Sequence, residues 1–281
     1  DVDYRGGNDD ATNDANSATL LGKPVTGESR INFRNYAQNR GGDWYDMDYQ
    51  VKKTVCWLIT IEYANRNHQI AVDNTLTAES YKKGGLGTGP NDLSHIDWNT
   101  FNSRYPVYDC GLTNSLGNSS GEVSLIIQDF PTSGESVTTQ ANSYRGIENF
   151  FGDIFEWTNG VNIDNGANAA SVYIANSFKK SDTDYLGYSK IGELSQSNGY
   201  IEQIIFGEGG DIFPKGLTSA SSSTYYSDFL LQNFSSKGLK ALFASGSASS
   251  GLRSGLTFAR VTESPSTKSP RIGSRLCLLK S

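Results

Sequence analysis

The sequence predicts an α+β domain with short, twisted strands, few helices and long loops. Composition is the first reason: glycine contributes 30 of the 281 residues and aromatic side chains 11%, a mixture typical of short strands joined by turns. The second is that one clear segment carries apolar residues at helical spacing. The third is that clusters of Gly, Asn and Ser divide much of the remaining chain into short apolar runs.

The sequence predicts a polar N-terminal arm over residues 1–30, followed by a single domain over residues 31–281. Residues 1–19 mix Asn, Asp, Gly and Ala with few apolar side chains, which is typical of extended or loosely ordered chain. The first residues do not form a secretion signal. We therefore expect that a leader has been removed or that the protein leaves its cell by another route, such as within a virion.

A helix is predicted to begin near Tyr49, after the Gly41-Gly42 turn. Asp48 precedes it and is of a residue type that caps helices. Apolar side chains then recur at helical spacing and predict one buried face, formed by Val51, Val55, Leu58, Ile59 and Tyr63. Because several residues of this helix are β-branched, its propensity is low and tertiary packing must hold it.

Short strands are predicted after the helix, over residues 122–127, 172–174 and 201–206, with a closing strand over residues 272–279. We expect Ile272, Leu276 and Leu278 of the closing strand to point inward. The glycine-rich stretch 207–211 lacks the Lys-Ser/Thr pair of a phosphate-binding loop, so it is predicted to be an ordinary loop.

The charge is unevenly distributed. From Phe234 onward the chain carries four Lys, four Arg and one Glu, a net charge of +7, which leaves −13 for the rest of a chain whose net charge is −6. The overall acidity argues against general nucleic-acid binding. The asymmetry can steer an acidic ligand to the C-terminal loops, although separate solvation of most of these charges is the simpler interpretation. No apolar stretch is long enough to span a membrane.

No cofactor or metal site is predicted. Cys56 and Cys277 lie in apolar runs and are interpreted as small core residues, and no C-x-x-C pair occurs with Cys110 or elsewhere. The carboxylates of Asp43, Asp46 and Asp48 are interpreted as caps and solvated turns. His68 and His95 are isolated, and we expect surface or hydrogen-bonding roles for them.

Residues 143–160 combine aromatic and paired polar side chains. Glu156 lies between Phe155 and Trp157, so its carboxylate should be buried and needs partners, with Arg145 or backbone N–H groups as candidates. We interpret the segment as a structural motif, because no second titratable group that would support a general acid is visible beside it.

Residues 234–281 contain neither Asn nor Asp, whereas the whole chain has 23 Asn, the last being Asn233. An even distribution would place roughly four Asn there. Small and basic residues occupy the segment instead, and an apolar strand pattern follows. Composition alone leaves a binding-loop system and a chance Ser/Gly-rich loop about equally favoured.

Three motifs resemble those of one family. Gly152-Asp153-Ile154-Phe155-Glu156-Trp157 resembles the Gly-Asn-Val-Trp-Glu-Trp signature of C-type lectin folds of the formylglycine-generating-enzyme type. Ile272-Gly273-Ser274-Arg275-Leu276 resembles that family's closing Gly-Phe-Arg strand, and Ile61-Glu62-Tyr63-Ala64 resembles its Glu-Tyr-Ala-Ala helix. The resemblance spans about residues 34–278. It implies a C-type lectin-like fold in which structural roles fall to Gly152, Glu156, Trp157, Gly273 and Arg275.

Within this fold, the chain resembles the variable proteins of diversity-generating retroelements. In these proteins the C-terminal coding segment is rewritten at adenines of a template, so that Asn codons give way to many residue types while Gly, Pro, Ile and Leu positions stay. Residues 246–251, Gly-Ser-Ala-Ser-Ser-Gly, resemble the family's Gly-Asn-Trp-Asn-Asn-Gly pattern, with Ala248 in place of Trp. The resemblance would explain both the missing Asn and the fixed positions Gly246, Gly251, Gly255, Pro265 and Gly273.

The resemblance implies a hypervariable binding surface at about residues 243–271. The variable positions it implies are Ser245, Ser247, Ser249, Ser250, Arg253, Ser254, Thr257, Arg260, Thr262, Glu263, Thr267, Lys268, Ser269 and Arg271. The three arginines could give bidentate contacts to carboxylate or phosphate, and Phe258 is either an aromatic anchor or a core residue.

We therefore expect a non-enzymatic protein that binds an unidentified protein or surface ligand, an acidic one being an option. Its expected location is extracellular, on a cell surface or on a virion. Two alternatives remain: an oxidase of the formylglycine-generating type, whose C-terminal cysteine pair the chain lacks, and a structural virion or pilus component attached through its acidic arm.

Overall fold

The computed structural model describes residues 24–68, 110–127, 137–175, 181–269 and 271–278. This part of the chain is rich in strands and holds two α-helices, α2 (Arg30–Asn39) and α3 (Tyr49–Glu62), and two short 3-10 helices, η5 (Asn114–Leu116) and η6 (Ala248–Arg253). The prediction of an α+β class with many strands and few helices is confirmed for this part of the chain.

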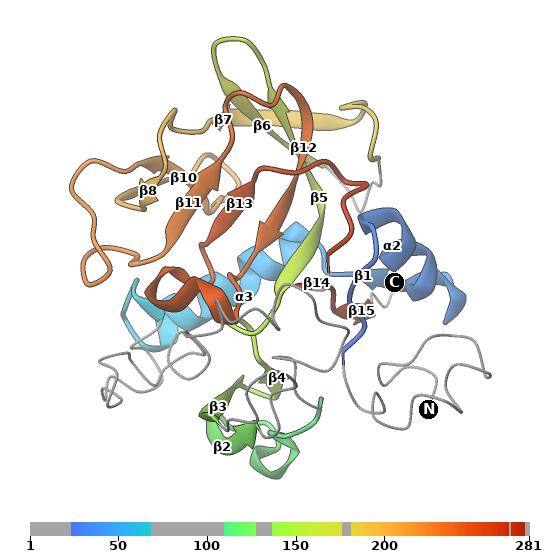
Figure 1. Cartoon of the computed structure of the whole chain (residues 1–281), viewed down its shortest axis with the longest axis vertical. Coiled ribbons are helices and arrows are strands. Elements are labelled where there is room, and N and C mark those ends of the chain that lie inside the picture. The colour runs from blue at the N-terminus through green and yellow to red at the C-terminus, as the bar shows by residue number, and fades with distance from the viewer. Residues whose placement is uncertain (1–23, 69–109, 128–136, 176–180, 270, 279–281) are drawn as a thin grey trace.

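The largest sheet has eight strands and curls like half a barrel (Figure 1). Its order is β7 (Tyr188–Glu193), β6 (Ala170–Ala175), β5 (Phe155–Asn165), β12 (Gly238–Ala244), β13 (Ala259–Val261), β11 (Phe229–Gln232) and β8 (Gly199–Tyr200). β14 (Ile272–Gly273) pairs with the beginning of β5. The last part of the chain therefore contributes three strands, β12, β13 and β14, to the central sheet.

Smaller sheets surround this one. β1 (Trp44–Asp46) pairs with β15 (Leu276–Leu278), and β9 (Gln203–Ile205) pairs with β10 (Phe213–Gly216). A separate three-stranded sheet contains β2 (Gly121–Ile127), β3 (Val137–Tyr144) and β4 (Ile147–Glu148). The predicted strands 122–127 and 172–174 are confirmed as β2 and β6, and the strand predicted over 201–206 is shorter than expected.

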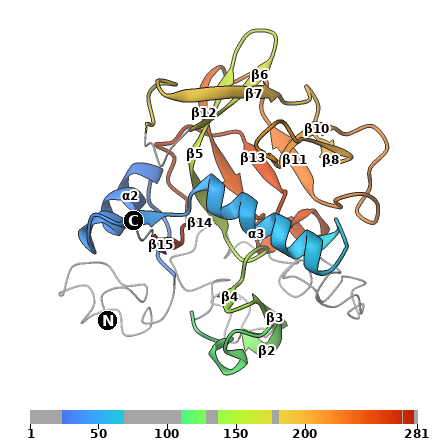
Figure 2. The same ribbon diagram turned by 180° about the vertical axis from the view of Figure 1, so that it is seen from behind.

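The large sheet separates two hydrophobic cores. α3 lies across one face (Figure 2), where Tyr49, Cys56 and Ile59 pack against residues such as Val161 and Ile163 of β5. On the other face, the core holds Phe33 of α2 together with Phe155, Trp157, Ala241, Phe243, Phe258 and Ile272. Phe258 is therefore a core residue and not a surface anchor.

A bulge in β5 lets one strand serve both cores. The register between β5 and β12 shifts between Lys240 and Leu242, and Gly160 lies in the facing stretch with φ +72°. A Cβ at Gly160 would lie 2.8 Å from Asp48 Oδ2, so glycine is required there for space as well as for conformation.

The cap of α3 is confirmed, but its buried face differs from the prediction. Asp48 accepts a hydrogen bond from the Gln50 backbone N–H at 2.8 Å. The buried residues are Tyr49, Lys52, Cys56 and Ile59, whereas Leu58 is 50% exposed. Polar contacts to the loop between β9 and β10 hold Tyr49 inward: Tyr49 Oη donates to Asp211 at 3.1 Å and accepts from the Ile212 N–H at 3.0 Å.

The predicted boundary between arm and domain also needs correction. Residues 24–29 belong to the fold, because Val25 packs on the second core and the Gly27 N–H donates to the Ser269 carbonyl at 3.0 Å. Ser29 then caps α2, a helix that sequence reasoning missed because its buried face carries Arg30 and Arg34 beside Phe33 and Ala37. Residues 1–23 lie outside the described part of the chain.

The closing strand was predicted as one element and is two. β14 joins β5 and buries Ile272, as expected. β15 instead pairs with the short edge strand β1, so Leu276 and Leu278 are 42% and 45% exposed and their predicted inward orientation is wrong. Cys277 between them is half-buried.

Candidate functional site

The C-terminal segment begins at a buried polar network. Ser245 follows β12 in the left-handed region, with φ +74°, and is fully buried. Lys52 Nζ donates to Ser245 Oγ at 2.5 Å, and Ser245 Oγ donates to Glu156 Oε2 at 3.1 Å. Arg275 Nε donates to the other oxygen of the Glu156 carboxylate. This network ties the beginning and the end of the segment to one strand.

Glu156 is buried, as predicted, but its partners differ from those expected. They are Lys52, whose Nζ lies 3.6 Å from Oε2, and Arg275. Arg145 pairs with Glu62 at 2.9 Å and its side chain is 61% exposed. Burial lowers the pKa of Lys52 although Glu156 opposes this effect.

The five residues with expected structural roles lie around this network. Trp157 is fully buried, and its Nε1 donates to the Glu28 carbonyl at 3.0 Å. The Gly152 N–H donates to the Ser245 carbonyl at 3.2 Å. A Cβ at Gly273 would lie 3.0 Å from the Val25 carbonyl and would also clash with Ile154. Glu156 and Arg275 complete the set.

Four of the expected variable positions are buried, so their side chains are not at the surface as expected. They are Ser245, Ser247, Ser254 and Thr257. Ser254 Oγ donates to the Ser247 carbonyl at 3.2 Å. Thr257 donates to Asp228 Oδ2 twice, from its backbone N at 2.8 Å and from Oγ1 at 2.6 Å. These contacts hold the shape of the segment.

Nine positions present a half-buried or exposed side chain: Ser250, Arg253, Arg260, Thr262, Glu263, Thr267, Lys268, Ser269 and Arg271. The Ser249 side chain lies outside the described part of the structure. The nine come from η6, from β13 and from the loop between β13 and β14 (Figure 1). The structure thus alternates buried anchors with accessible polar side chains along one segment.

Two arginines of the segment, Arg253 and Arg260, lie on the sheet face opposite α3. Arg260 pairs with Phe243 across β13 and β12, and its guanidinium lies 5.4 Å from the Phe155 ring and 6.0 Å from the Phe243 ring. The Arg253 guanidinium lies 4.7 Å from the Phe229 ring of β11. Because residues paired across strands share a face, both guanidinium groups cover the aromatic side of the sheet.

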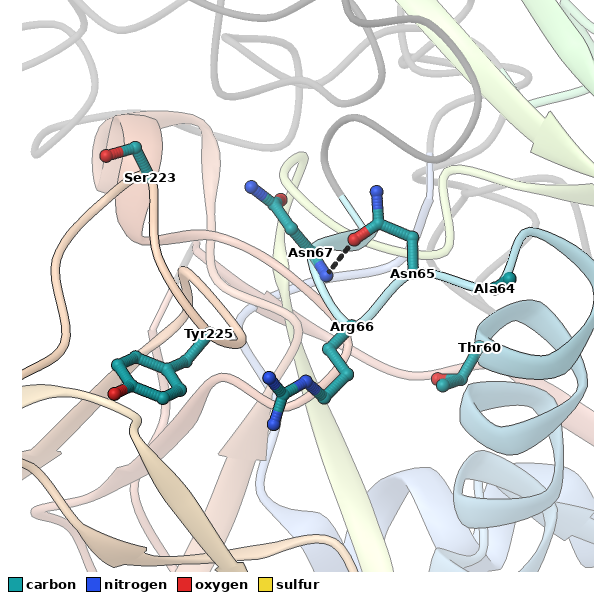
Figure 3. Close-up of a pocket in the computed structure, with 7 residues that line it drawn as sticks. All are labelled: Thr60, Ala64, Asn65, Arg66, Asn67, Ser223 and Tyr225. Atoms are coloured by element: carbon teal, nitrogen blue, oxygen red, sulfur yellow. Dashed lines mark hydrogen bonds between the residues drawn. The ribbon is translucent and has the colours of Figure 1, made fainter.

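A pocket that sequence reasoning missed lies at the end of α3 (Figure 3). It has a volume of about 550 Å³ and is lined by Thr60, Ala64, Asn65, Arg66, Asn67, Ser223 and Tyr225. The Arg66 guanidinium lies over the rings of Tyr225 and Tyr226, at 5.6 and 5.5 Å. Two sequence features could have indicated this pocket. They are the tyrosine pair among serines and the Asn-Arg-Asn sequence that follows the helix.

Beside this pocket, His68 is buried between Cys56 and Asp228. Thr60 Oγ1 is 3.0 Å from His68 Nε2, and His68 Nδ1 is 3.9 Å from Asp228 Oδ2. Burial lowers the pKa of His68, but Cys56 and Asp228 outweigh it and raise the pKa to about 10. The hydrogen-bonding role expected of His68 is confirmed and the surface alternative is wrong, while His95 lies outside the described residues.

Asp228 contacts both His68, which lies beside the pocket, and Thr257 of the C-terminal segment. Of the acidic group near α3, Asp48 is a cap as predicted, whereas Asp46 is buried and accepts a hydrogen bond from Asn159 Nδ2.

In the described ranges, no group of three or more His, Cys, Asp or Glu side chains is placed to hold a metal ion. No helix in those ranges is long and apolar enough to cross a membrane.

Comparison of the chain with protein-family models and with curated proteins gave no match.

Proposed function

We propose that the chain is a non-enzymatic, hypervariable binding protein. Its C-terminal loop surface is diversified by a retroelement, while a C-type lectin-type scaffold stays fixed. The ligand is a protein or another surface component. The protein itself is extracellular, on a cell surface or on a virion. The oxidase and the structural-component alternatives have no comparable support.

One observation carries this proposal. A segment without Asn or Asp alternates buried anchors, such as Ser245 and Thr257, with accessible polar side chains, such as Arg253 and Thr262. Anchors that keep the backbone in place allow the accessible positions to change without unfolding the domain. This is the arrangement that a diversified binding surface requires.

The oxidase alternative is disfavoured by the state of Cys277. That chemistry needs a pair of cysteines near the C-terminus, and Cys277 is the one cysteine after Cys110. Burial raises the pKa of its thiol to about 11, which disfavours the thiolate that a metal ligand or nucleophile must supply.

Sequencing the locus from its source population tests the proposal. We expect adenine-directed substitutions to cluster within residues 245–271 at accessible positions such as Arg253, Arg260 and Thr262. The matched control is residues 181–193, which lie outside the segment and whose exposed polar side chains include Thr183, Asp184 and Lys190. Sparse variation at equal frequency in both regions would remove the retroelement from the proposal.

A further inference from the structure

Arg260 is held in one orientation at the surface. Its Nε donates to Thr262 Oγ1 at 2.8 Å, and its Nη2 lies 3.5 Å from Glu263 Oε1. The guanidinium also lies over the buried rings of Phe155 and Phe243, and the side chain is 23% exposed. A guanidinium fixed in this way loses little conformational freedom when it binds a ligand.

Arg271 contacts the same residue of β5, Phe155, as the Arg260 guanidinium. The Phe155 N–H donates to the Arg271 carbonyl at 2.9 Å, and the Phe155 ring lies beneath the Arg260 guanidinium. Burial lowers the pKa of Arg271, and the positive charge of Arg260 lowers it further. Phe155 therefore places the two arginines next to each other, Arg260 against its ring and Arg271 against its backbone N–H.

Among the described residues, the two arginines have one carboxylate partner between them. Within the described residues, Glu263 is the carboxylate within ion-pair distance of Arg260, and none lies within that distance of Arg271. The other basic side chains of the segment differ: Lys268 pairs with Glu28 at 2.9 Å, and Arg275 pairs with Glu156. Two guanidinium groups with one carboxylate at 3.5 Å form a site that an added anion would stabilise.

We propose that Arg260 and Arg271 form an oxyanion site, which accepts a carboxylate, sulfate or phosphate group of the ligand. This inference rests on the proposed binding function, because it places the ligand on the same surface. The charge of the whole chain agrees with it: residues 1–233 carry −13 and residues 234–281 carry +7. An acidic ligand is repelled by most of the molecule and attracted to this segment.

Anion titration of the full-length, ¹⁵N-labelled protein tests the site through the arginine Nε–Hε signals. Sodium sulfate and sodium acetate are each added in exchange for sodium chloride at constant ionic strength. We expect the signals of Arg260 and Arg271 to shift together along a saturating curve. Tighter binding of sulfate would identify a tetrahedral oxyanion, and tighter binding of acetate a planar carboxylate.

Lysine variants assign the signals and measure each contribution. Arg260→Lys and Arg271→Lys keep the charge but lose the planar pair of donors, so each should weaken anion binding by about fivefold. Arg253→Lys is the matched control, because Arg253 also covers an aromatic ring, but that ring is Phe229 and not Phe155; it should change binding less than about twofold. If a lysine variant fails to fold, the parent titration with the Arg253 signal as reference still decides.

The inference is overturned if the signals of Arg260 and Arg271 follow ionic strength in the same way as that of Arg253. Its failure is distinct from failure of the proposed function. Clustered variation at the locus without saturable titration would remove the oxyanion site alone. Saturable titration with sparse, uniform variation would keep the site and remove the diversification.

Discussion

At the residue scale, Glu156 compensates two buried cations at once. Lys52 approaches one carboxylate oxygen and Arg275 the other, and Ser245 bridges Lys52 to the carboxylate. Breaking a buried pair is costly because the partner is left as an uncompensated charge in a medium of low polarity. The carboxylate therefore holds the two ends of the C-terminal segment to β5.

Replacing Glu156 by Gln should destabilise the protein by about 3–5 kcal/mol, since Lys52 and Arg275 would lose their counter-charge. The free energy of unfolding, measured by urea denaturation, checks this. Glu62→Gln is the matched control, because it removes a carboxylate from a more exposed ion pair with Arg145. Equal losses from both substitutions would show that Glu156 is not a special anchor.

His68 makes stability depend on pH in a defined direction. Its folded pKa of about 10 exceeds the ordinary 6.5, so its contribution is fully present below pH 6.5 and is lost as pH rises through the folded pKa. Between pH 6.5 and 9, the parent should lose up to about 1.4 kcal/mol per pH unit relative to His68→Gln. Parallel pH profiles of unfolding for the two proteins would contradict a charged His68.

Single residues could be predicted where local rules decide them. Asp48 precedes an apolar periodic segment, and capping depends on nearby backbone alone. The partners of Glu156 could not be predicted, since Lys52 is 104 positions and Arg275 119 positions away. Arg145 was the nearest cation in sequence, but its side chain lies outside the core. The buried position of His68 could not be predicted for the same reason, because its partner Asp228 is distant in the chain.

At the element scale, accessible and anchoring positions of the C-terminal segment should respond differently to substitution. Arg253→Ala, Arg260→Ala and Thr262→Ala together should leave a folded domain, with a loss of about 0.5–1 kcal/mol for each arginine that leaves a ring. Thermal unfolding followed by circular dichroism checks this. Loss of cooperative unfolding in the triple variant would show that these side chains hold the fold and do not form a replaceable surface.

The matched anchoring substitution is Thr257→Val, which keeps the side-chain shape and removes the hydroxyl. Asp228 would lose the hydrogen bond from Oγ1 and keep the one from the backbone N–H. The expected cost is about 1–3 kcal/mol, because a buried carboxylate oxygen is left with fewer donors. A Thr257→Val variant as stable as the parent would place Thr257 among the replaceable positions.

Elements were predictable where their pattern was simple. β2 and β6 follow from β-branched runs bounded by turns, whereas α2 was missed because Arg30 and Arg34 occupy its buried face. Arg30 makes this possible by donating to the Val161 carbonyl at 2.8 Å and to Asn162 Oδ1 at 2.7 Å. The binary pattern of a helix cannot reveal a face that is buried through charge and hydrogen bonds.

At the scale of the whole molecule, chain segments far apart in sequence hold the second core together. The residues before α2 pack against the strands and loops formed by the last part of the chain. Trp157 in the middle of the sequence donates to the Glu28 carbonyl, and Gly27 donates to Ser269. The residues that precede α2 therefore help to hold the accessible loop between β13 and β14 in place.

Truncation should separate the predicted polar arm from this support. Removal of residues 1–19 should leave the free energy of unfolding unchanged, because the arm was predicted from its polar composition to lie outside the domain. Removal of residues 1–29 should cost about 3 kcal/mol or more: it takes away the Ser29 cap, worth about 1 kcal/mol, and the acceptor of the buried Trp157 N–H, worth about 1–3 kcal/mol. Urea denaturation of both truncated proteins measures the difference.

Because Gly27 contacts Ser269, the longer truncation should also weaken saturable anion binding at Arg271, whereas the shorter one should not. Equal stability of the two truncated proteins would place the domain boundary after residue 29 and would leave the loop between β13 and β14 without support from the N-terminal side.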